Sequence, residues 1–539
     1  MNRLKITMTK KQETMKKHLL KTRLLSFATL CGIALTFASC AKDDVAQNPA
    51  KPNEEENKNL TTFVAGGENK TRTSLNYSGN FYWEDSDYIY VKDDDGVLRK
   101  STNAPDKKVA SFSYKVPGKF TASSSYKVYY FGKNSSNNQV VIPVAQSQST
   151  PNNTAHFGVS GDYGTATATG TLGGGSFSFQ LEHQAAYLVF HPYVSNTLLQ
   201  SCYLTKIEVS SDNDIASTYT LNASTGTLQS GSTGATTDKE IILSTKGSGD
   251  YANGFPLTTA SDNVAVNGAY MVIKPGTHTL KVRYWLKDVS TGTEGTVTKA
   301  FKAFNYDVNN YYDIDGNLNI RNYDGDHYYM WDAQEQYWKG HEWNLGGSQP
   351  TLSYGLTGAT TSNDYAKSNA DSRWYNESYP GFGVSNPATH TSCKDLPNVN
   401  EMTWYAAKGE PRWDADELWT TMGHLYKGGM WFKKKANISG YNPNTAVDGS
   451  DWRTNGNGNI WSVSQTLPDA ADANNYFYLP ALGYYYSDQL DDVGSIGDYW
   501  SSSALPGSNG SAYYLNFSSS YIIVNNGSRG YGFRSEAFQ

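Results

Sequence analysis

Oxygen-bearing side chains alternate along one short stretch of the chain, which reads Asp-Ile-Asp-Gly-Asn-Leu-Asn over residues 313–319. Carboxylates and amides at every second position could bind calcium. An EF-hand loop, however, needs glycine at its sixth position and glutamate at its twelfth. Those positions hold Leu318 and Asp324. We therefore expect a turn here and predict no bound metal.

The sequence contains no recognised motif of a hydrolase or of a phosphate-binding protein. His183 and His191 lie on or beside a predicted strand and lack ligand spacing. No Gly-x-Ser-x-Gly elbow is present, and Gly173-Gly-Gly-Ser lacks the Lys-Ser/Thr of a phosphate loop. The abundant carboxylates leave a glycan-processing enzyme as a minor hypothesis, because sequence alone does not set the spacing between two of them. We predict a protein that is not an enzyme and has no cofactor.

The four cysteines predict no disulfide framework. Cys31 and Cys40 lie in or directly after an apolar N-terminal segment, and Cys202 and Cys393 are far apart in the sequence. Without a Cys-x-x-Cys pair or a His/Cys cluster, a zinc site is not predicted.

The segment before Cys40 has the three parts of a secretory signal. A basic region within residues 16–23 precedes the apolar run Leu24–Phe37, which is short for a membrane span. Two small residues, Ala38 and Ser39, then precede the cysteine. This arrangement resembles the lipobox of bacterial lipoproteins. The resemblance implies that residues 1–39 are a signal peptide and that Cys40 is acylated, for example with palmitate.

The residues after Cys40 predict where such a protein is delivered. The stretch 42–44 reads Lys-Asp-Asp and resembles the signal that exports some Gram-negative lipoproteins to the outer face of the outer membrane. We expect a surface-exposed, lipid-anchored protein of the cell outer membrane, with residues 40–59 as a flexible linker. The alternative is a soluble secreted protein cut near Ser39, in which Cys40 has no role.

Charge and composition narrow the classes of partner and fold. Removal of residues 1–39 leaves 37 basic and 50 acidic residues, a net charge of −13, which argues against nucleic acid as a partner. The chain has 40 Tyr, 13 Trp and 49 Gly, a composition typical of β-rich proteins with many turns. Alternation over Phe177–His183 indicates a strand with one packed face. Further strands are predicted at Leu60–Val64, Tyr88–Val91, Tyr126–Phe131, Val140–Pro143 and Ala185–Phe190.

Four short motifs in this region occur in the order and spacing of one known family. They are Lys70-Thr-Arg-Thr, Trp83 ahead of Asp87-Tyr-Ile, Ile142-Pro-Val-Ala-Gln-Ser-Gln, and Phe179-x-Leu-x-His-x-x-Ala-Tyr-Leu. Together they resemble the fimbrillin family of pilin-like lipoproteins. The resemblance implies two tandem β-sandwich domains, an N-terminal one at 60–198 and a second at 199–320.

The resemblance also implies a role for Arg72. In fimbrillins a protease cuts after an arginine that follows the first strand, and the freed strand leaves a groove for a strand of the neighbouring subunit. An unpaired strand edge binds another strand through main-chain hydrogen bonds. The other hypothesis, an ordinary exposed loop arginine, stays open.

Two helices are predicted in the C-terminal part of the chain. Asn398-Val-Asn-Glu401 offers a cap and an N3 glutamate, and Gly409 is expected to end that helix. The stretch 414–417 repeats the pattern ahead of a second helix, whose apolar face would hold Leu418, Met422 and Leu425.

Two helices, a long Gly/Asn-rich loop and terminal strands follow one another in an order that resembles the FISUMP module, a relative of the C-type-lectin-like fold. The resemblance implies an α+β domain at 321–539. The calcium-dependent sugar motifs of C-type lectins are missing, because Glu410-Pro-Arg lacks the asparagine and no Trp-Asn-Asp occurs. The fold alone therefore implies neither calcium nor sugar.

Aromatic side chains in this part are the candidate ligand-binding residues, namely Trp413, Tyr484, Tyr485 and Tyr486. Such rings stack on sugars and anchor protein interfaces. Trp419 and Trp500 lie in patterned segments and are expected in the core.

Two functions remain open at this point. The first is a surface adhesin of fimbrillin type, a minor or tip pilus subunit that accepts a donor strand from another subunit. Its lectin-like module would then bind a host or bacterial glycan or protein. A continuing C-terminal module would prevent the chain from donating a strand itself. The second is a stand-alone outer-membrane lipoprotein that binds glycans.

Overall fold

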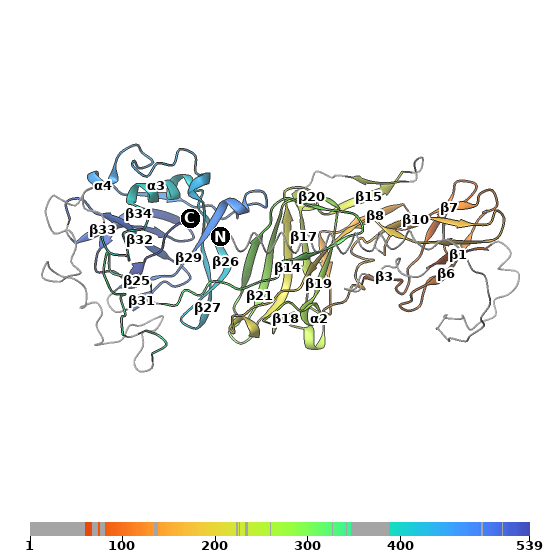
Figure 1. Cartoon of the computed structure of the whole chain (residues 1–539), viewed down its shortest axis with the longest axis horizontal. Coiled ribbons are helices and arrows are strands. Elements are labelled where there is room, and N and C mark those ends of the chain that lie inside the picture. The colour runs from red at the N-terminus through yellow and green to blue at the C-terminus, as the bar shows by residue number, and fades with distance from the viewer. Residues whose placement is uncertain are drawn as a thin grey trace, which may run out of the picture. The chain divides into compact units, whose positions relative to one another are not determined.

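The structure is a computed structural model. It describes residues 60–66, 74–75, 81–133, 138–222, 225, 227–231, 236–258, 260–325, 327–340, 342–345, 388–486, 489–508 and 510–539. All of these belong to one compact unit, Asn59–Gln539. Strands dominate this unit, which confirms the prediction of a mainly β protein (Figure 1).

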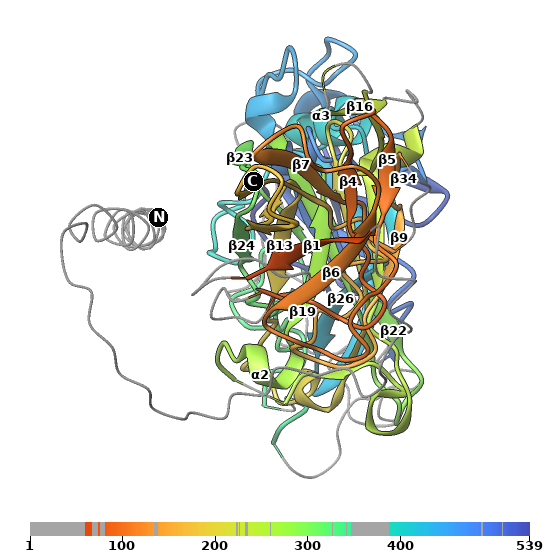
Figure 2. The same cartoon turned by 90° about the vertical axis from the view of Figure 1, so that its right-hand side faces the viewer.

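The N-terminal sheet joins eight described strands in the order β5-β4-β7-β10-β11-β1-β6, with β12 on β10. Its strands are β1 (Leu60–Ala65), β4 (Tyr90–Lys92), β5 (Leu98–Lys100), β6 (Phe112–Pro117), β7 (Ser125–Tyr130), β10 (Gly164–Gly170), β11 (Ser176–Phe179) and β12 (Glu182–His183). In Figure 2, the paired strands β1 and β6 of this sheet lie toward the viewer. The strands alternate buried and exposed residues, because one face covers a core of aromatic and branched side chains around Phe63, Trp83 and Tyr130.

A second hydrophobic core lies where strands that follow residue 200 pair with strands that precede it. β13 pairs with β19 and β24, and β8 pairs with β15, which pairs with β16. The bounds are β8 (Gln139–Ile142), β13 (Ala186–Phe190), β15 (Ser217–Leu221), β16 (Leu228–Gly231), β19 (Ala269–Ile273) and β24 (Tyr311–Ile314). All five residues of β13 are buried, as its continuous apolar sequence predicts.

A nine-stranded sheet runs from this second core into the C-terminal part of the chain, in the order β29-β27-β26-β22-β21-β14-β17-β9, with β18 on β14. Its strands are β9 (Ala145–Ser147), β14 (Tyr203–Ser211), β17 (Glu240–Ser244), β18 (Phe255–Pro256), β21 (Leu280–Lys287), β22 (Glu294–Ala300), β26 (Arg412–Thr421), β27 (His424–Lys433) and β29 (Tyr476–Pro480). The join is the parallel pairing of β22 with β26 at Thr296 and Glu417.

The C-terminal part, from residue 321 on, has its own sheet in the order β25-β35-β32-β33-β34-β28. Its strands are β25 (Tyr328–Tyr329), β28 (Asn459–Ser462), β32 (Gly497–Ala504), β33 (Ser511–Phe517), β34 (Tyr521–Ser528) and β35 (Phe533–Arg534). Helix α3 (Val399–Lys408) packs on one face of it beside α4 (Trp452–Asn455). The predicted capping box is present, with Asn398 and Glu401 each bonding the other's backbone N–H. Gly409 ends α3, as predicted.

The second predicted helix, over residues 414–425, is wrong. This stretch forms the end of β26, a two-residue turn and the start of β27, with Thr421 paired to His424. Met422 and Gly423 have φ values of 47° and 73°, as a tight type I′ hairpin requires. Trp419, Thr420 and Thr421 are of the aromatic and β-branched types that favour strands, and antiparallel pairing with β27 stabilises them.

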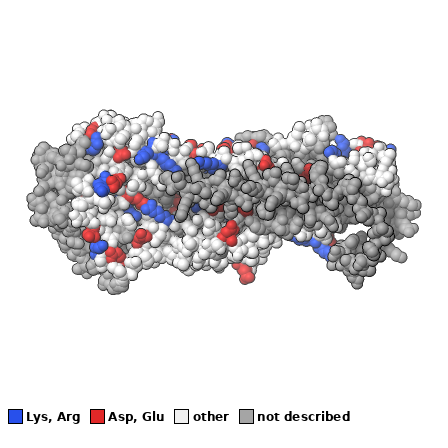
Figure 3. Space-filling view, viewed as in Figure 1, with Lys and Arg blue, Asp and Glu red and all other residues white. Residues whose placement is uncertain are grey.

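The remaining described elements are short and connect these sheets. They are β2 (Ser74–Leu75), β3 (Phe81–Tyr82), β20 (Gly276–His278), β23 (Phe304–Tyr306), β30 (Tyr484–Tyr486), β31 (Gln489–Asp491), α2 (Val264–Asn267) and the 3₁₀ turns at Leu199–Ser201, Thr236–Lys239, Gly249–Tyr251, Lys435–Asn437 and Ala473–Asn475. On the face drawn in Figure 3, basic and acidic side chains of the described residues are interspersed.

Candidate functional sites

Two residues with predicted roles, Cys40 and Arg72, lie outside the described residues. Acylation and cleavage therefore stay predictions. Within the described ranges, no helix is both long enough and apolar enough to cross a membrane.

The first strand, β1, is held on both of its edges. It pairs antiparallel with β6 from Leu60 to Ala65 and parallel with β11 from Thr62 to Ala65. Phe63 is fully buried, and its ring lies 5.1 Å from Phe120 and 5.3 Å from Phe177. Removal of β1 would expose two strand edges and an apolar slot, which is the geometry that an incoming strand needs.

Residues 538 and 539 contact the C-terminal core from its surface. Phe538 packs its ring 5.3 Å from Tyr405 and 6.0 Å from Tyr499. The backbone oxygen of Gln539 accepts hydrogen bonds from the Lys435 N–H and the Tyr405 hydroxyl, both at 3.2 Å. Phe538 is half-buried against this core, and Gln539 is exposed.

The predicted ligand-binding aromatics divide into buried and accessible residues. Trp413 and Tyr485 are 7% and 1% exposed and belong to the core of the C-terminal part. Tyr484 is half-buried and Tyr486 is 48% exposed. The side chains of β30 alternate across its two faces, so Tyr485 points inward between its neighbours.

Tyr484 and Tyr486 belong to a larger aromatic cluster on the outer face of β32, β33 and β35. Trp500 and Phe533 form its base, with ring centroids 4.4 Å apart. Tyr484 packs against Phe533 at 5.9 Å, and Tyr486 packs edge-on against Tyr531 at 5.2 Å. We call this set, with Tyr514 on β33, the tyrosine face; Tyr514 and Tyr531 are half-buried.

A buried carboxyl lies beside the tyrosine face. Asp498 on β32 is 3% exposed, and its Oδ1 accepts a 2.9 Å hydrogen bond from the Asn516 amide. Burial, with a smaller contribution from the charge of Asp492, raises the pKa of Asp498 to about 7. A carboxyl next to accessible rings can accept hydrogen bonds from hydroxyl groups of a ligand that stacks on those rings.

Sequence analysis missed Asp498, Tyr514 and Tyr531. One signal was present: β32 alternates, so Asp498 and Trp500 share a face while Tyr499 faces the opposite core. Tyr531 joins the tyrosine face because of the order of the strands in the sheet, and no local sequence pattern indicates that order.

A buried group of charges lies where β22 pairs with β26. The Arg283 guanidinium is 3.1 Å from Asp414 and also donates to the Thr296 hydroxyl at 3.1 Å. Glu417 is 8% exposed and accepts hydrogen bonds from the N–H and hydroxyl of Thr298, at 2.9 and 2.6 Å. Burial, reinforced by the Asp414 charge, raises the pKa of Glu417 to about 7.

The two described cysteines are free and buried. Burial raises the pKa of both thiols to about 12. The Cys393 sulfur accepts the Asp332 N–H at 3.2 Å, and His390 lies 3.3 Å from the Asp332 carboxylate. Burial therefore disfavours the thiolate, which is the nucleophilic form of Cys393.

The stretch predicted to form a turn, residues 313–319, uses its oxygens within the chain. Asp315 accepts the Asn317 N–H and Asn317 accepts the Asn319 N–H, at 3.1 and 3.0 Å. Asp313 lies 3.2 Å from the His191 ring. In the part of the chain that the structure describes, no group of three or more His, Cys, Asp or Glu side chains could hold a metal ion.

Comparison with known proteins gave matches among solved structures alone. No family model matches the chain, and no curated protein matches it. A fimbrial protein from Bacteroides ovatus covers 88% of this chain and 98% of its own, with 11% identity and a TM-score of 0.23. The fimbrial anchor protein Mfa2 from Porphyromonas gingivalis covers 44% of this chain and 80% of its own, with 12% identity and a TM-score of 0.21.

A candidate cell adhesion protein from Bacteroides ovatus covers 48% of this chain and 92% of its own, with 15% identity and a TM-score of 0.30. Identities and TM-scores at this level do not establish a family.

Proposed function

We propose that this chain is a surface-exposed adhesin of fimbrillin type that joins a pilus as a minor or tip subunit. Cys40 would carry the lipid that delivers it to the outer membrane. Cleavage after Arg72 would release β1, and a strand of another subunit would take its place between β6 and β11. The observation that carries this proposal is the double pairing of β1 around the buried Phe63.

The folded part from residue 321 on supports a minor or tip position in the filament. A subunit that passes a strand on needs a free segment, whereas the strands β32, β33, β34 and β35 of this part pair with one another in one sheet. Such a subunit would accept a strand without donating one of these four. The part from residue 321 on would then present the tyrosine face to a ligand.

N-terminal sequencing of the surface form tests the cleavage. A start at Thr73 in filament-associated protein is the expected result, and Arg72→Ala should remove the chain from filaments. Arg321→Ala is the matched control, because the Arg321 side chain is 61% exposed and far from β1 in the sequence. Filaments that form from the purified, cleaved chain alone would contradict the terminal position.

A stand-alone glycan-binding lipoprotein is the second candidate. The observation in its favour is the tyrosine face with Asp498, which is formed without any partner. An acylated start at Cys40 on all surface protein, together with unchanged localisation of Arg72→Ala, would favour this function over the first.

A further inference from the structure

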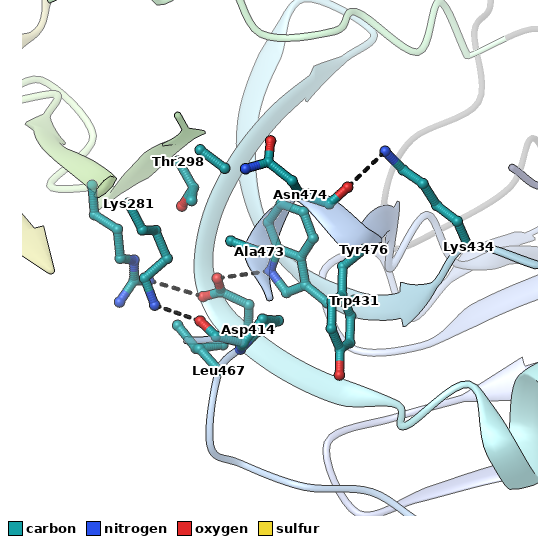
Figure 4. A pocket seen from close by; sticks show the side chains of 12 residues that line it. Lys281, Thr298, Asp414, Trp431, Lys434, Leu467, Ala473, Asn474 and Tyr476 are labelled. Carbon is teal, nitrogen blue, oxygen red and sulfur yellow. Dashed lines mark hydrogen bonds and ion pairs between the residues drawn. The ribbon is translucent and has the colours of Figure 1, made fainter. Parts of the chain in front are cut away.

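A cavity of about 200 Å³ lies at the junction of the nine-stranded sheet (Figure 4). None of its lining residues belongs to the tyrosine face or to β1. Lys281, Arg283 and Thr298 of β21 and β22 line one side. Trp431 of β27, Tyr476 of β29 and the loop with Leu467 and Asn474 line the other side. A cavity of about 150 Å³ accepts a benzene ring, so this one has room for one six-membered ring with substituents.

The cavity carries an excess of positive charge. Lys281, Arg283 and Lys434 line it, and Asp414 is its one acidic lining residue. Asp414 neutralises Arg283 at 3.1 Å. Lys281 and Lys434 have no carboxylate within ion-pair distance among the described residues, and they donate to the backbone oxygens of Pro468 and Asn474, at 2.6 and 3.1 Å.

Among the three cationic residues of the cavity, Lys281 is unusual because it is buried, with only 9% of its surface exposed, and is bonded to a backbone oxygen in place of a carboxylate. A buried ammonium without a counter-ion is unfavourable. Burial and the nearby Arg283 charge lower the pKa of Lys281, and the carboxylates of Glu208, Glu240 and Asp414, all beyond ion-pair distance, offset part of this lowering. An anion in the cavity would place a counter-ion within ion-pair distance of Lys281.

The other lining residues indicate what kind of molecule would carry the anionic group. Trp431, Leu467 and Ala473 give apolar and aromatic surface, while the Thr298 hydroxyl and the Asn474 amide can bond hydroxyl groups. The Trp431 indole N–H is already bonded to Asp414 at 3.1 Å, which fixes the ring as a wall. Rings carrying both an apolar face and hydroxyl groups match this lining.

We propose that this junction cavity binds one acidic sugar residue, with its carboxylate between Lys281 and Lys434 and its ring against Trp431. The site is independent of the proposed pilus function, because it uses neither β1 nor the tyrosine face.

Calorimetric titration of the full chain tests the site with four probes. D-glucuronate is expected to bind at least tenfold more tightly than D-glucose, which lacks the carboxylate. It should also bind at least tenfold more tightly than benzoate, which lacks the hydroxyl groups, and than inorganic sulfate, which lacks a ring. Equal binding of glucuronate and any of these three, or no binding of glucuronate, would overturn the proposal.

Variants locate the binding in the cavity. Lys281→Gln and Lys434→Gln should each weaken glucuronate binding at least tenfold, and Lys281→Arg should retain it. Lys427→Gln is the matched control, because Lys427 lies on the same strand as Trp431 and pairs with Asp416 outside the cavity. Thermal unfolding of each variant separates loss of binding from loss of fold. Full affinity in both folded glutamine variants would overturn the site.

Discussion

Arg283 on β21 and Asp414 on β26 form a buried ion pair at 3.1 Å, although 131 positions separate them in the sequence. Asp414 also accepts the Trp431 indole N–H at 3.1 Å and the Glu417 backbone N–H at 3.2 Å. The carboxylate thus joins three strands where the nine-stranded sheet passes into the C-terminal part of the chain. For a buried pair of this kind, removal of one partner alone lowers the free energy of unfolding more than removal of both partners.

Arg283→Met is expected to lower the free energy of unfolding by about 3–5 kcal/mol, because it leaves Asp414 charged and buried. The double variant Arg283→Met/Asp414→Asn should recover part of that loss. Urea unfolding followed by tryptophan fluorescence measures both. Lys427→Met, which breaks the exposed pair with Asp416, is the control and should cost less than about 1 kcal/mol. Equal losses in the two single variants would contradict the role of the buried pair.

Glu417 should make the protein less stable as the pH rises. Its pKa is about 7 in the folded chain, against 4.5 for an ordinary glutamate. Below about pH 4.5 the carboxyl is protonated in both states. Between pH 4.5 and 7 the folded state keeps a proton that the unfolded state has released, so the free energy of unfolding falls as pH increases. Above pH 7 the loss is complete.

The variant Glu417→Gln isolates this effect, because the amide is neutral and similar in shape. Relative to the native chain, it should gain stability between pH 4.5 and 7, by on the order of 3 kcal/mol at most. Chemical unfolding at a series of pH values gives the difference curve. Glu335→Gln, at a glutamate whose side chain is 56% exposed, should give a flat difference. A flat curve for Glu417→Gln would show that folding does not raise the pKa of Glu417.

The geometry of the tyrosine face predicts which substitutions weaken ligand binding and which do not. If a glycan array identifies a ligand for the full chain, Tyr486→Ala should weaken its binding about tenfold or more, since stacked aromatic anchors carry much of the binding energy. Asp498→Asn should weaken it too, and should remove any change in affinity near pH 7, where Asp498 titrates. Tyr311→Ala is the control, because Tyr311 is 39% exposed on β24. Binding unaffected by both variants would place the ligand elsewhere.

The buried ring of β1 predicts how firmly that strand is held. Phe63→Ala should lower the free energy of unfolding of the N-terminal sheet by about 3–5 kcal/mol, because it leaves a cavity against Phe120 and Phe177. Hydrogen exchange of the β6 and β11 amides reports this locally. Thr61→Ala, at a half-buried position of the same strand, should change exchange little. Similar exchange in the two variants would show that Phe63 does not anchor β1.

Some elements were predictable because their signals are local. The capping box at Asn398 and Glu401 and the stop at Gly409 lie within a dozen residues, so the sequence suffices for α3. The predicted strand Leu60–Val64 appears as β1, extended by one residue. Trp419 and Trp500 are 1% and 0% exposed, which confirms that both belong to the core.

The helix predicted over 414–425 failed because Trp419, Thr420 and Thr421 are residue types that favour a strand. Pairing of β26 with β27, and with β22 at Glu417, then favoured the strand, and β22 lies more than a hundred residues away in the sequence. Gly423, at a positive φ in the turn, is the local signal for a hairpin, whereas the apparent cap at Asp414 pointed to a helix.

The sequence by itself determined the β-rich composition, the capped helix α3, several strands and the aromatic residues from which a binding face could form. Tertiary structure decided which of those residues are accessible, because β30 turns Tyr485 into the core and leaves Tyr486 outside. It also decided the neighbours of β1 and the meeting of Lys281, Arg283 and Asp414. Sheet pairing joins residues at any separation along the chain, and a single sequence carries no local record of that pairing.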